Sequence, residues 1–125
     1  MTEHQLYEQI AIYLQLQYPK VVYRFDLAAD LKLTAGQAVK HKKLHPRRGY
    51  PDLFIAKPSK NYHGLFIEIK RDKTRIRKKN GEWANDHIAE QAAMMAELAV
   101  AGYCVGFAVG FDEVKRMIDQ YLSVV

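Results

Sequence analysis

The chain has 125 residues, 49% of them hydrophobic, which is enough for one hydrophobic core, so we expect a single domain over residues 1–125. The 19 Lys and Arg against 14 Asp and Glu give a net charge of +5, which argues against an acidic protein and favours a polyanionic partner. The single cysteine excludes an internal disulfide, and neither a signal-like N-terminus nor an apolar run of membrane-spanning length is present, so we expect a cytoplasmic protein with no membrane partner.

The first predicted element is a helix over residues 3–17, because apolar residues recur at helical spacing and Pro19 follows. Its stripe comprises Leu6, Ile10, Tyr13 and Leu14. Glu3 lies seven positions before Ile10 and falls on this stripe, whereas Glu8 points nearly the opposite way. Glu3 is therefore the unusual carboxylate of this helix.

Residues 21–25 are the first candidate strand. Residues 34–44 form a polar, lysine-rich helix or loop that ends near Pro46. Two further strands are predicted over residues 51–57 and 64–70, because the turn-rich residues between them suit a strand pair joined by a loop. That pairing places Asp52, Glu68 and Lys70 near the same end of the pair.

A longer helix is predicted to begin at Asn85 or Asp86 and to end before Gly102. Gln91 lies at the margin of its apolar face, which comprises Ile88, Ala92, Met95 and Ala99. An apolar strand over residues 103–109 follows. The final helix has apolar residues at core spacing, at Val114, Met117, Ile118, Tyr121 and Leu122.

The predicted element order is α-β-β-β-α-β-α. This order is typical of an α/β (α+β) fold in which helices cover a mixed central sheet. The strand after the helical crossover is expected to pair in parallel.

Two short motifs carry the chemistry. GYPDLF occupies residues 49–54 and LFIEIK occupies residues 65–70, so Glu68 follows Asp52 by sixteen positions. Because side chains alternate along a strand, Glu68 and Lys70 share one face while Ile67 and Ile69 fill the other. Either motif alone is common, since Pro-Asp pairs occur in turns and Glu-x-Lys occurs on the wet face of sheets. Their combination in so apolar a setting indicates a functional site.

A carboxylate in so apolar a strand is costly without a partner, and a divalent metal or a lysine supplies one. Mg²⁺ binds through one or two carboxylates and keeps several waters. Asp52 and Glu68 form such a pair, and the backbone carbonyl of Ile69 adds an oxygen. Lys70 beside them would hold the attacking water or neutralise a transition-state phosphate. The residues therefore predict a hydrolytic centre for phosphodiesters.

Positive charge is concentrated on either side of these motifs. Residues 40–48 hold five Lys or Arg and residues 70–79 hold seven, so twelve of the nineteen fall in two segments. Such clusters bind phosphates through counterion release, although a merely solvated surface is the alternative. The predicted nucleic-acid contacts are Lys42, Lys43, Arg47, Arg48, Arg71, Lys73, Arg75, Arg77, Lys78 and Lys79.

The two motifs resemble the PD-(D/E)XK nuclease signature, and the whole chain is similar to the small stand-alone VRR-NUC domains of bacteria and phages. The resemblance implies a restriction-endonuclease-like core, a bacterial or phage-infected cell, and Mg²⁺ or Mn²⁺ as cofactor. It implies Asp52 and Glu68 as metal ligands, Lys70 as the catalytic lysine and Gln91 as a catalytic glutamine. Glu3 matches the first-helix glutamate ligand, with Glu8 as its rival.

The resemblance further implies an endonuclease that cuts branched DNA, such as four-way junctions, as a homodimer. Paired incisions on opposing strands require two sites, which also favours a dimer. Two alternatives remain. A sequence-specific restriction-type endonuclease would need more chain for reading bases, and a non-catalytic basic DNA-binding module would have no need of Asp52, Glu68 and Lys70.

Overall fold

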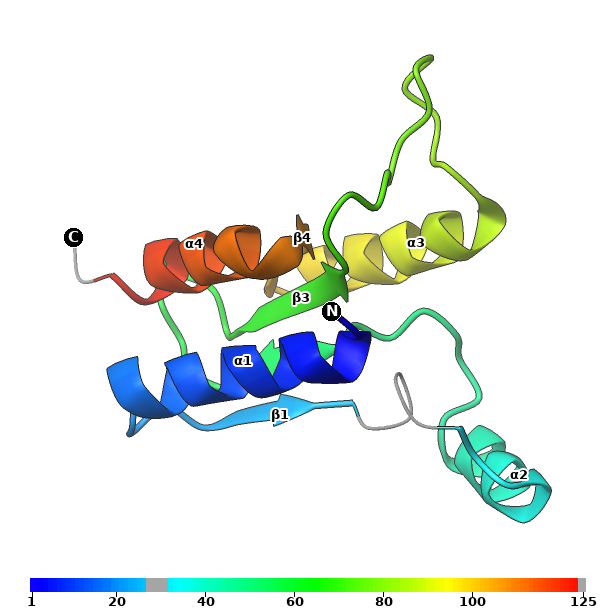
Figure 1. Ribbon diagram of the computed structural model, residues 1–125, viewed down its shortest axis with the longest axis horizontal. Helices are drawn as coiled ribbons and strands as arrows, with labels where there is room; N and C mark the ends of the chain where they lie inside the picture. Colours follow the sequence, from blue (N-terminus) through cyan, green and yellow to red (C-terminus); the bar gives the residue numbers. More distant parts are fainter. Residues whose placement is uncertain (27–31, 124–125) are drawn as a thin grey trace.

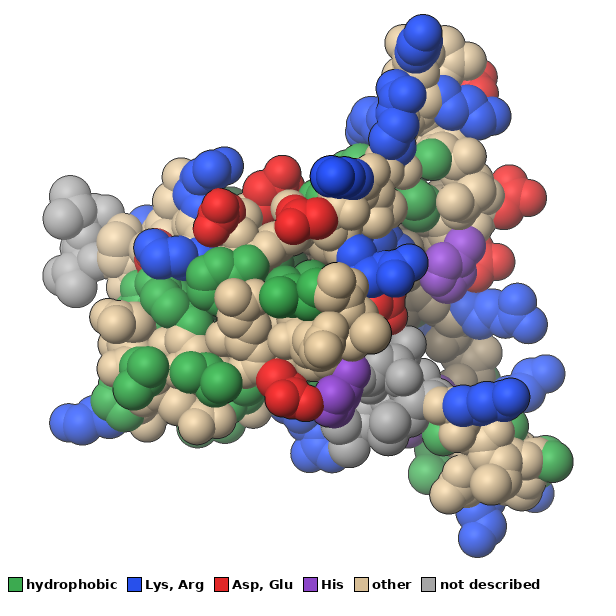
Figure 2. Space-filling view, viewed as in Figure 1, with side chains coloured by type: hydrophobic (Ala, Val, Ile, Leu, Met, Phe, Trp, Pro, Cys, Tyr) green, Lys and Arg blue, Asp and Glu red, His purple; other side chains and the backbone are tan. Residues whose placement is uncertain are grey.

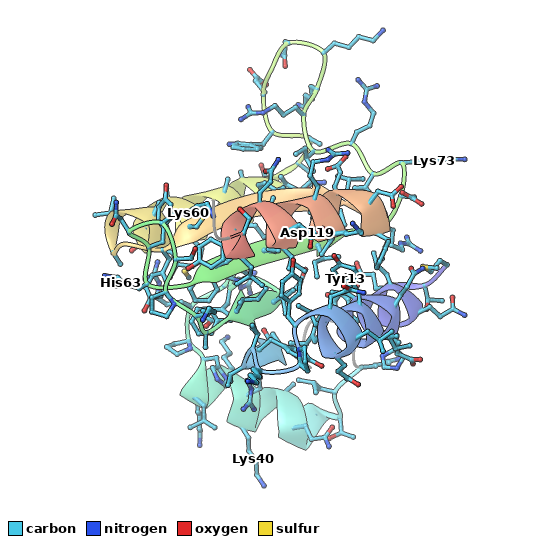
Figure 3. All side chains as sticks on the ribbon, turned by 90° about the vertical axis from the view of Figure 1, so that its left-hand side faces the viewer. Tyr13, Lys40, Lys60, His63, Lys73 and Asp119 are labelled. Atoms are coloured by element: carbon cyan, nitrogen blue, oxygen red, sulfur yellow. The ribbon has the colours of Figure 1, made fainter. Side chains whose placement is uncertain are left out.

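The computed structural model describes residues 1–26 and 32–123, whose helices cover both faces of a four-stranded sheet (Figure 1). In chain order the elements are α1 (Glu3–Gln17), β1 (Tyr23–Phe25), α2 (Ala35–Leu44), β2 (Leu53–Ile55), β3 (Leu65–Lys70), α3 (Asp86–Val100), β4 (Cys104–Val109) and α4 (Gly110–Leu122). Helices α1 and α4 contact each other on one face, and α3 lies on the other (Figures 1 and 3).

The sheet has the order β1-β2-β3-β4, with β2 antiparallel to both β1 and β3. Strand β4 pairs in parallel with β3 after the α3 crossover, as predicted. In the β2–β3 register Leu53 lies opposite Ile67. The mixed sheet covered by helices confirms the predicted fold class.

Alternation along β3 separates the core from the site. Ile67 and Ile69 are fully buried in the main hydrophobic cluster together with residues of α1 and α4, such as Ile10 and Ile118. The opposite face is aromatic, and the ring of Phe66 stacks on that of Phe54 at 4.4 Å between centroids. The predicted division between the two faces of β3 is therefore correct for its apolar residues.

The helix predicted over residues 3–17 is confirmed, and it begins with a capping box in which Thr2 and Gln5 exchange hydrogen bonds. The predicted face of α3 is partly wrong. Ile88 and Met95 are buried, but Ala99 is exposed, and the helix buries Met94 and Gln91 instead. The helix therefore turns its longer side chains, rather than its alanines, toward the sheet.

The sequence does not distinguish helix from loop over residues 34–44, and the predicted order does not count this segment, which the structure shows as helix α2, as an element. It starts from a second capping box, formed by Thr34 and Gln37, and buries none of its residues. Figure 1 shows it projecting from the body of the molecule. A ten-residue helix without a buried face is only marginally stable in water, so its polar, cationic surface is available to a partner.

The loop between β2 and β3 is fastened to the C-terminal end of α4. The ammonium group of Lys60 donates to the carbonyl oxygens of Tyr121 at 3.2 Å and Ser123 at 2.7 Å, and the Ser59 hydroxyl donates to Tyr121 O at 2.6 Å. A cation there also offsets the negative end of the helix dipole. The strand pair that carries the acidic motif is thus anchored at its turn.

Asp119 on α4 joins α1 to α4. It accepts hydrogen bonds from the hydroxyls of Tyr13 at 2.5 Å and Tyr18 at 2.7 Å, and from Lys115 at 3.0 Å; Tyr13 and Asp119 face each other in Figure 3. Although burial opposes ionisation, these three donors hold the pKa of Asp119 below its ordinary value. A carboxylate with a lowered pKa stabilises the fold above the unfolded-state pKa and loses that effect in acid.

We therefore expect Asp119→Asn to lower the free energy of unfolding by about 1–3 kcal/mol at pH 7. The deficit should shrink at pH 2.5, because lowering the pH toward the reduced pKa of the wild-type carboxyl favours its protonation. Urea unfolding at both pH values measures this difference. Asp112→Asn, which removes an equal charge from the first turn of the same helix, should cost less than about 1 kcal/mol. Equal losses in the two variants would contradict a specific role for Asp119.

Within the described residues, none of the helices combines the length and the apolar composition that a membrane crossing requires.

Candidate functional site

The site lies at the end of the β2–β3 pair that is opposite its anchored turn. Asp52 immediately precedes β2, and its Oδ2 accepts a 2.8 Å hydrogen bond from the backbone N–H of Ile69 on β3. Only 6% of Asp52 is exposed. Because β2 begins at Leu53, opposite Ile67, residues 68–70 extend beyond the ladder and the Asp52 side chain replaces the missing strand partner.

A close backbone approach positions Asp52 against α3. Gly49 has φ +85°, and a Cβ atom at this position would lie 2.8 Å from the carbonyl oxygen of Glu90 and 3.2 Å from the Cα of Gln91. Only glycine accepts both the conformation and the contact without strain. This explains the glycine of the first motif, and it places Gln91 beside the segment that leads into Asp52.

Glu68 is the most deeply buried ionisable group of the site, with 1% of its surface exposed. Burial, together with hydrogen bonding and repulsion from Asp52, raises the pKa of Glu68 to about 10. Within the described chain its Oε1 atom has no hydrogen-bond partner. A buried oxygen atom without a hydrogen-bond donor favours a cation or a hydrated cation beside it.

Lys70 and Glu3 act on Glu68 in opposite directions. The half-buried Lys70 lies close enough for its charge to lower the pKa of Glu68, while Glu3, also half-buried, raises it. Glu8 is exposed and pairs with His4 at 2.7 Å. The structure therefore brings Glu3 toward the site and leaves Glu8 on the surface, although the role of Glu3 as a metal ligand stays a prediction.

Tyr7 was missed by the sequence interpretation. It is 6% exposed and stacks on Phe25 at 5.1 Å between ring centroids. Burial, followed by the charge of Asp52 and by a hydrogen bond to it, raises the pKa of Tyr7 far above its usual range. The phenol therefore holds the Asp52 carboxyl. The sequence signal that could have identified Tyr7 as a site residue is its position one turn after Glu3, on the same face of the helix.

Gln91 is buried with 6% exposure, which fits its predicted place near the site. Its amide nitrogen lies 3.3 Å from Nε2 of the exposed His87, and its Oε1 has no partner among the described residues. Two buried oxygens without donors, one on Glu68 and one on Gln91, thus occur near the same end of the sheet.

The donor set suits Mg²⁺ or Mn²⁺. Residues 1–26 and 32–123 contain no group of three or more His, Cys, Asp and Glu side chains arranged to hold a metal. Two carboxylates supplemented by water and a backbone carbonyl are what Mg²⁺ ordinarily accepts from a protein. Asp52 and Glu68 meet this requirement. The Ile69 N–H points to Asp52, so its carbonyl, on the same side of the strand, faces this edge as well.

Positive charge flanks the site on two projecting parts of the chain, helix α2 and the segment after β3. Figure 2 shows Lys and Arg side chains gathered over α2 and along the segment after β3, on either side of the N-terminal end of α1. Most of the predicted nucleic-acid contacts are exposed there. Three of them have partners, because Arg47 pairs with Glu97 on α3, Arg77 lies over the ring of Trp83, and Lys78 lies 3.9 Å from Glu82.

The chain matches neither a protein-family model nor a curated protein. It does match a solved structure described as a VRR_NUC domain protein, with a TM-score of 0.73 and 28% sequence identity, over 98% of this chain and 88% of the other. The chain shares the VRR-NUC fold. This confirms the resemblance found in the motifs, and the VRR-NUC fold indicates a nuclease-type domain.

Proposed function

We propose that this VRR-NUC-like protein is a metal-dependent endonuclease that hydrolyses phosphodiester bonds in branched or otherwise structured DNA. The observation that carries the proposal is the buried Glu68 carboxyl with an unpartnered oxygen, next to Asp52 and Lys70. No apolar core needs this arrangement, whereas a hydrolytic metal site does. DNA as substrate is supported by the cations on both flanks.

Each residue has a defined part in the proposed reaction. Asp52 and Glu68, with the Ile69 carbonyl and Glu3, would hold Mg²⁺ or Mn²⁺, which activates water and shields the phosphate when bound. Tyr7 and the Ile69 N–H fix the Asp52 carboxyl. Lys70 would place the attacking water and neutralise charge on the phosphate as the bond to the leaving oxygen breaks. Gln91 would orient this arrangement from α3.

The proposed active form is a homodimer, because cutting two opposing strands of a junction requires two sites. Neither the dimer nor the junction preference follows from the single chain, so both belong to the proposal. Light scattering or analytical ultracentrifugation, with and without junction DNA, measures the oligomeric state.

A panel of four-way junctions, flaps, nicked duplexes and linear duplexes tests the function. With Mg²⁺ or Mn²⁺ we expect cleavage of at least one branched substrate, and none in EDTA. Fixed fragments from linear duplex would instead identify a sequence-specific enzyme. Salt-sensitive binding that metal does not affect, with no cleavage on any substrate, would contradict the nuclease proposal and identify a binding module.

A further inference from the structure

Residues 76–84, which we term the basic ribbon, form a short two-stranded hairpin that stands out from the domain (Figure 1). Ala84 N donates to Ile76 O at 2.9 Å, Lys78 N donates to Glu82 O at 2.8 Å, and Arg77 and Trp83 form an isolated β-bridge. At the tip, Gly81 N donates to Lys78 O at 3.0 Å. The ribbon therefore has its own regular hydrogen bonds.

Arg77 braces this ribbon. Its guanidinium lies 3.9 Å from the centroid of the Trp83 ring and donates to Gly81 O at 2.6 Å, so it links both strands to the tip. The Trp83 ring in turn packs against Phe107 of β4 at 5.6 Å between centroids. Trp83, covered by Arg77 and Phe107, is therefore not a stacking platform for bases, and Arg77 is occupied within the protein.

The other cations of the ribbon, and those of the residues just before it, face solvent. Lys79 at the tip and Arg75 and Lys73 before it are exposed and make no ion pair with another described residue. Lys78 approaches Glu82 only at 3.9 Å, an exposed pair that contributes little. Lys73 points away from the domain in Figure 3. An isolated two-stranded ribbon is marginally stable in water, so a braced, cationic one is suited to binding a polyanion.

We infer that the basic ribbon enters the major groove of duplex DNA beside the bond that is cut. The major groove, about 12 Å wide, admits a two-stranded β-ribbon, whereas the minor groove is only about 6 Å wide. A tip with adjacent Lys78 and Lys79 reaches phosphates and base-edge acceptors there. The inference rests on the proposed DNA substrate, but it does not depend on cleavage.

The chain also limits where the ribbon lies on the DNA. Lys70 and Lys79 are nine residues apart, and a fully extended chain of that length spans at most about 30 Å. DNA rises about 3.4 Å per base pair, so the tip lies within about nine base pairs of the phosphate held at Lys70. Helix α2 projects on the other side of the site (Figure 2), where its lysines would face the neighbouring backbone.

Dimethyl sulfate footprinting on a four-way junction tests the inference, because the reagent methylates guanine N7 in the major groove and adenine N3 in the minor groove. The experiment uses the full protein in EDTA, where cutting does not interfere. We expect N7 protection within about nine base pairs of the point of cleavage. Lys78→Ala/Lys79→Ala should remove that protection and reduce the slope of log Kd against log salt by about 1.8.

Lys20→Ala/Arg116→Ala is the matched control, since it removes two exposed charges that lie outside the ribbon, one in the turn after α1 and one in the middle of α4. It should leave N7 protection intact. Adenine N3 protection alone, equal binding to single strands, or a ribbon variant that keeps the wild-type footprint would overturn the inference. If the parent protein cuts DNA while any of these results is obtained, only the ribbon inference fails. N7 protection without any cleavage supports the ribbon inference and contradicts the nuclease proposal.

Discussion

Asp52→Asn and Lys70→Ala are each expected to slow DNA cleavage by at least about 100-fold while leaving DNA binding nearly unchanged. Asn at position 52 still accepts the hydrogen bond from Ile69 N but lacks the charge that a metal ligand needs. Ala at position 70 removes the ammonium group whose charge lowers the pKa of Glu68. Single-turnover cleavage of a junction in Mg²⁺, with binding measured in EDTA, separates the chemical step from affinity.

Glu8→Ala is the control for these two variants, because Glu8 is an exposed carboxylate on the same helix as Glu3. It should cut at the wild-type rate. Cleavage by Asp52→Asn or Lys70→Ala at the parent rate would remove that residue from the proposed centre. A Glu8 variant as slow as the Asp52 variant would show that Glu8 contributes to the proposed centre.

Glu68→Gln is expected to stabilise the metal-free protein above neutral pH. Between the ordinary value of 4.5 and the raised pKa of about 10, the folded protein keeps a proton on Glu68 that the unfolded chain has released. The metal-free wild type therefore loses stability as pH rises, by up to about 1.4 kcal/mol per pH unit from this group. The glutamine of the variant does not ionise, so the free energy of unfolding of the variant should depend less on pH.

Urea unfolding in EDTA at pH 5, 6.5 and 8 measures these slopes. Glu90→Gln, which changes an exposed carboxylate on α3, should keep the wild-type slope. Mg²⁺ or Mn²⁺ should raise the stability of the wild type, by about 2.7 kcal/mol at one hundred times the dissociation constant, and should not raise that of Glu68→Gln. Identical slopes for wild type and Glu68→Gln would show that the Glu68 carboxyl ionises normally in the fold.

The sequence predicted the parts of the fold that follow local periodicity. The strand pair around residues 51–70, the crossover helix and the parallel fourth strand all came from apolar repeats and turn residues. The acidic pair was predictable because Asp52 and Glu68 interrupt apolar strands on neighbouring segments. Their burial agrees with that interpretation, whereas their catalytic roles stay predictions.

Other features depend on tertiary contacts that periodicity does not reveal. Tyr7 reads as an ordinary core residue until Asp52 is placed beside it. Arg47 and Arg77 read as phosphate contacts because their partners, Glu97 and Trp83, are 50 and 6 positions away and pair only in the folded chain. Helix α2 lacks an apolar stripe, so its polar sequence did not distinguish helix from loop.

The anchoring of the β2–β3 turn has a dynamic consequence. At that turn, Ser59 and Lys60 bind the last carbonyls of α4, whereas the other end is held through Asp52, which contacts Glu68 and the N–H of Ile69. We expect local opening of this hairpin to begin at the end that depends on Asp52, because the turn is bound to α4 by three hydrogen bonds. Amide hydrogen exchange at Ile69, whose N–H is bound by Asp52, reports that opening directly, and a cation held by Asp52 and Glu68 together would slow it.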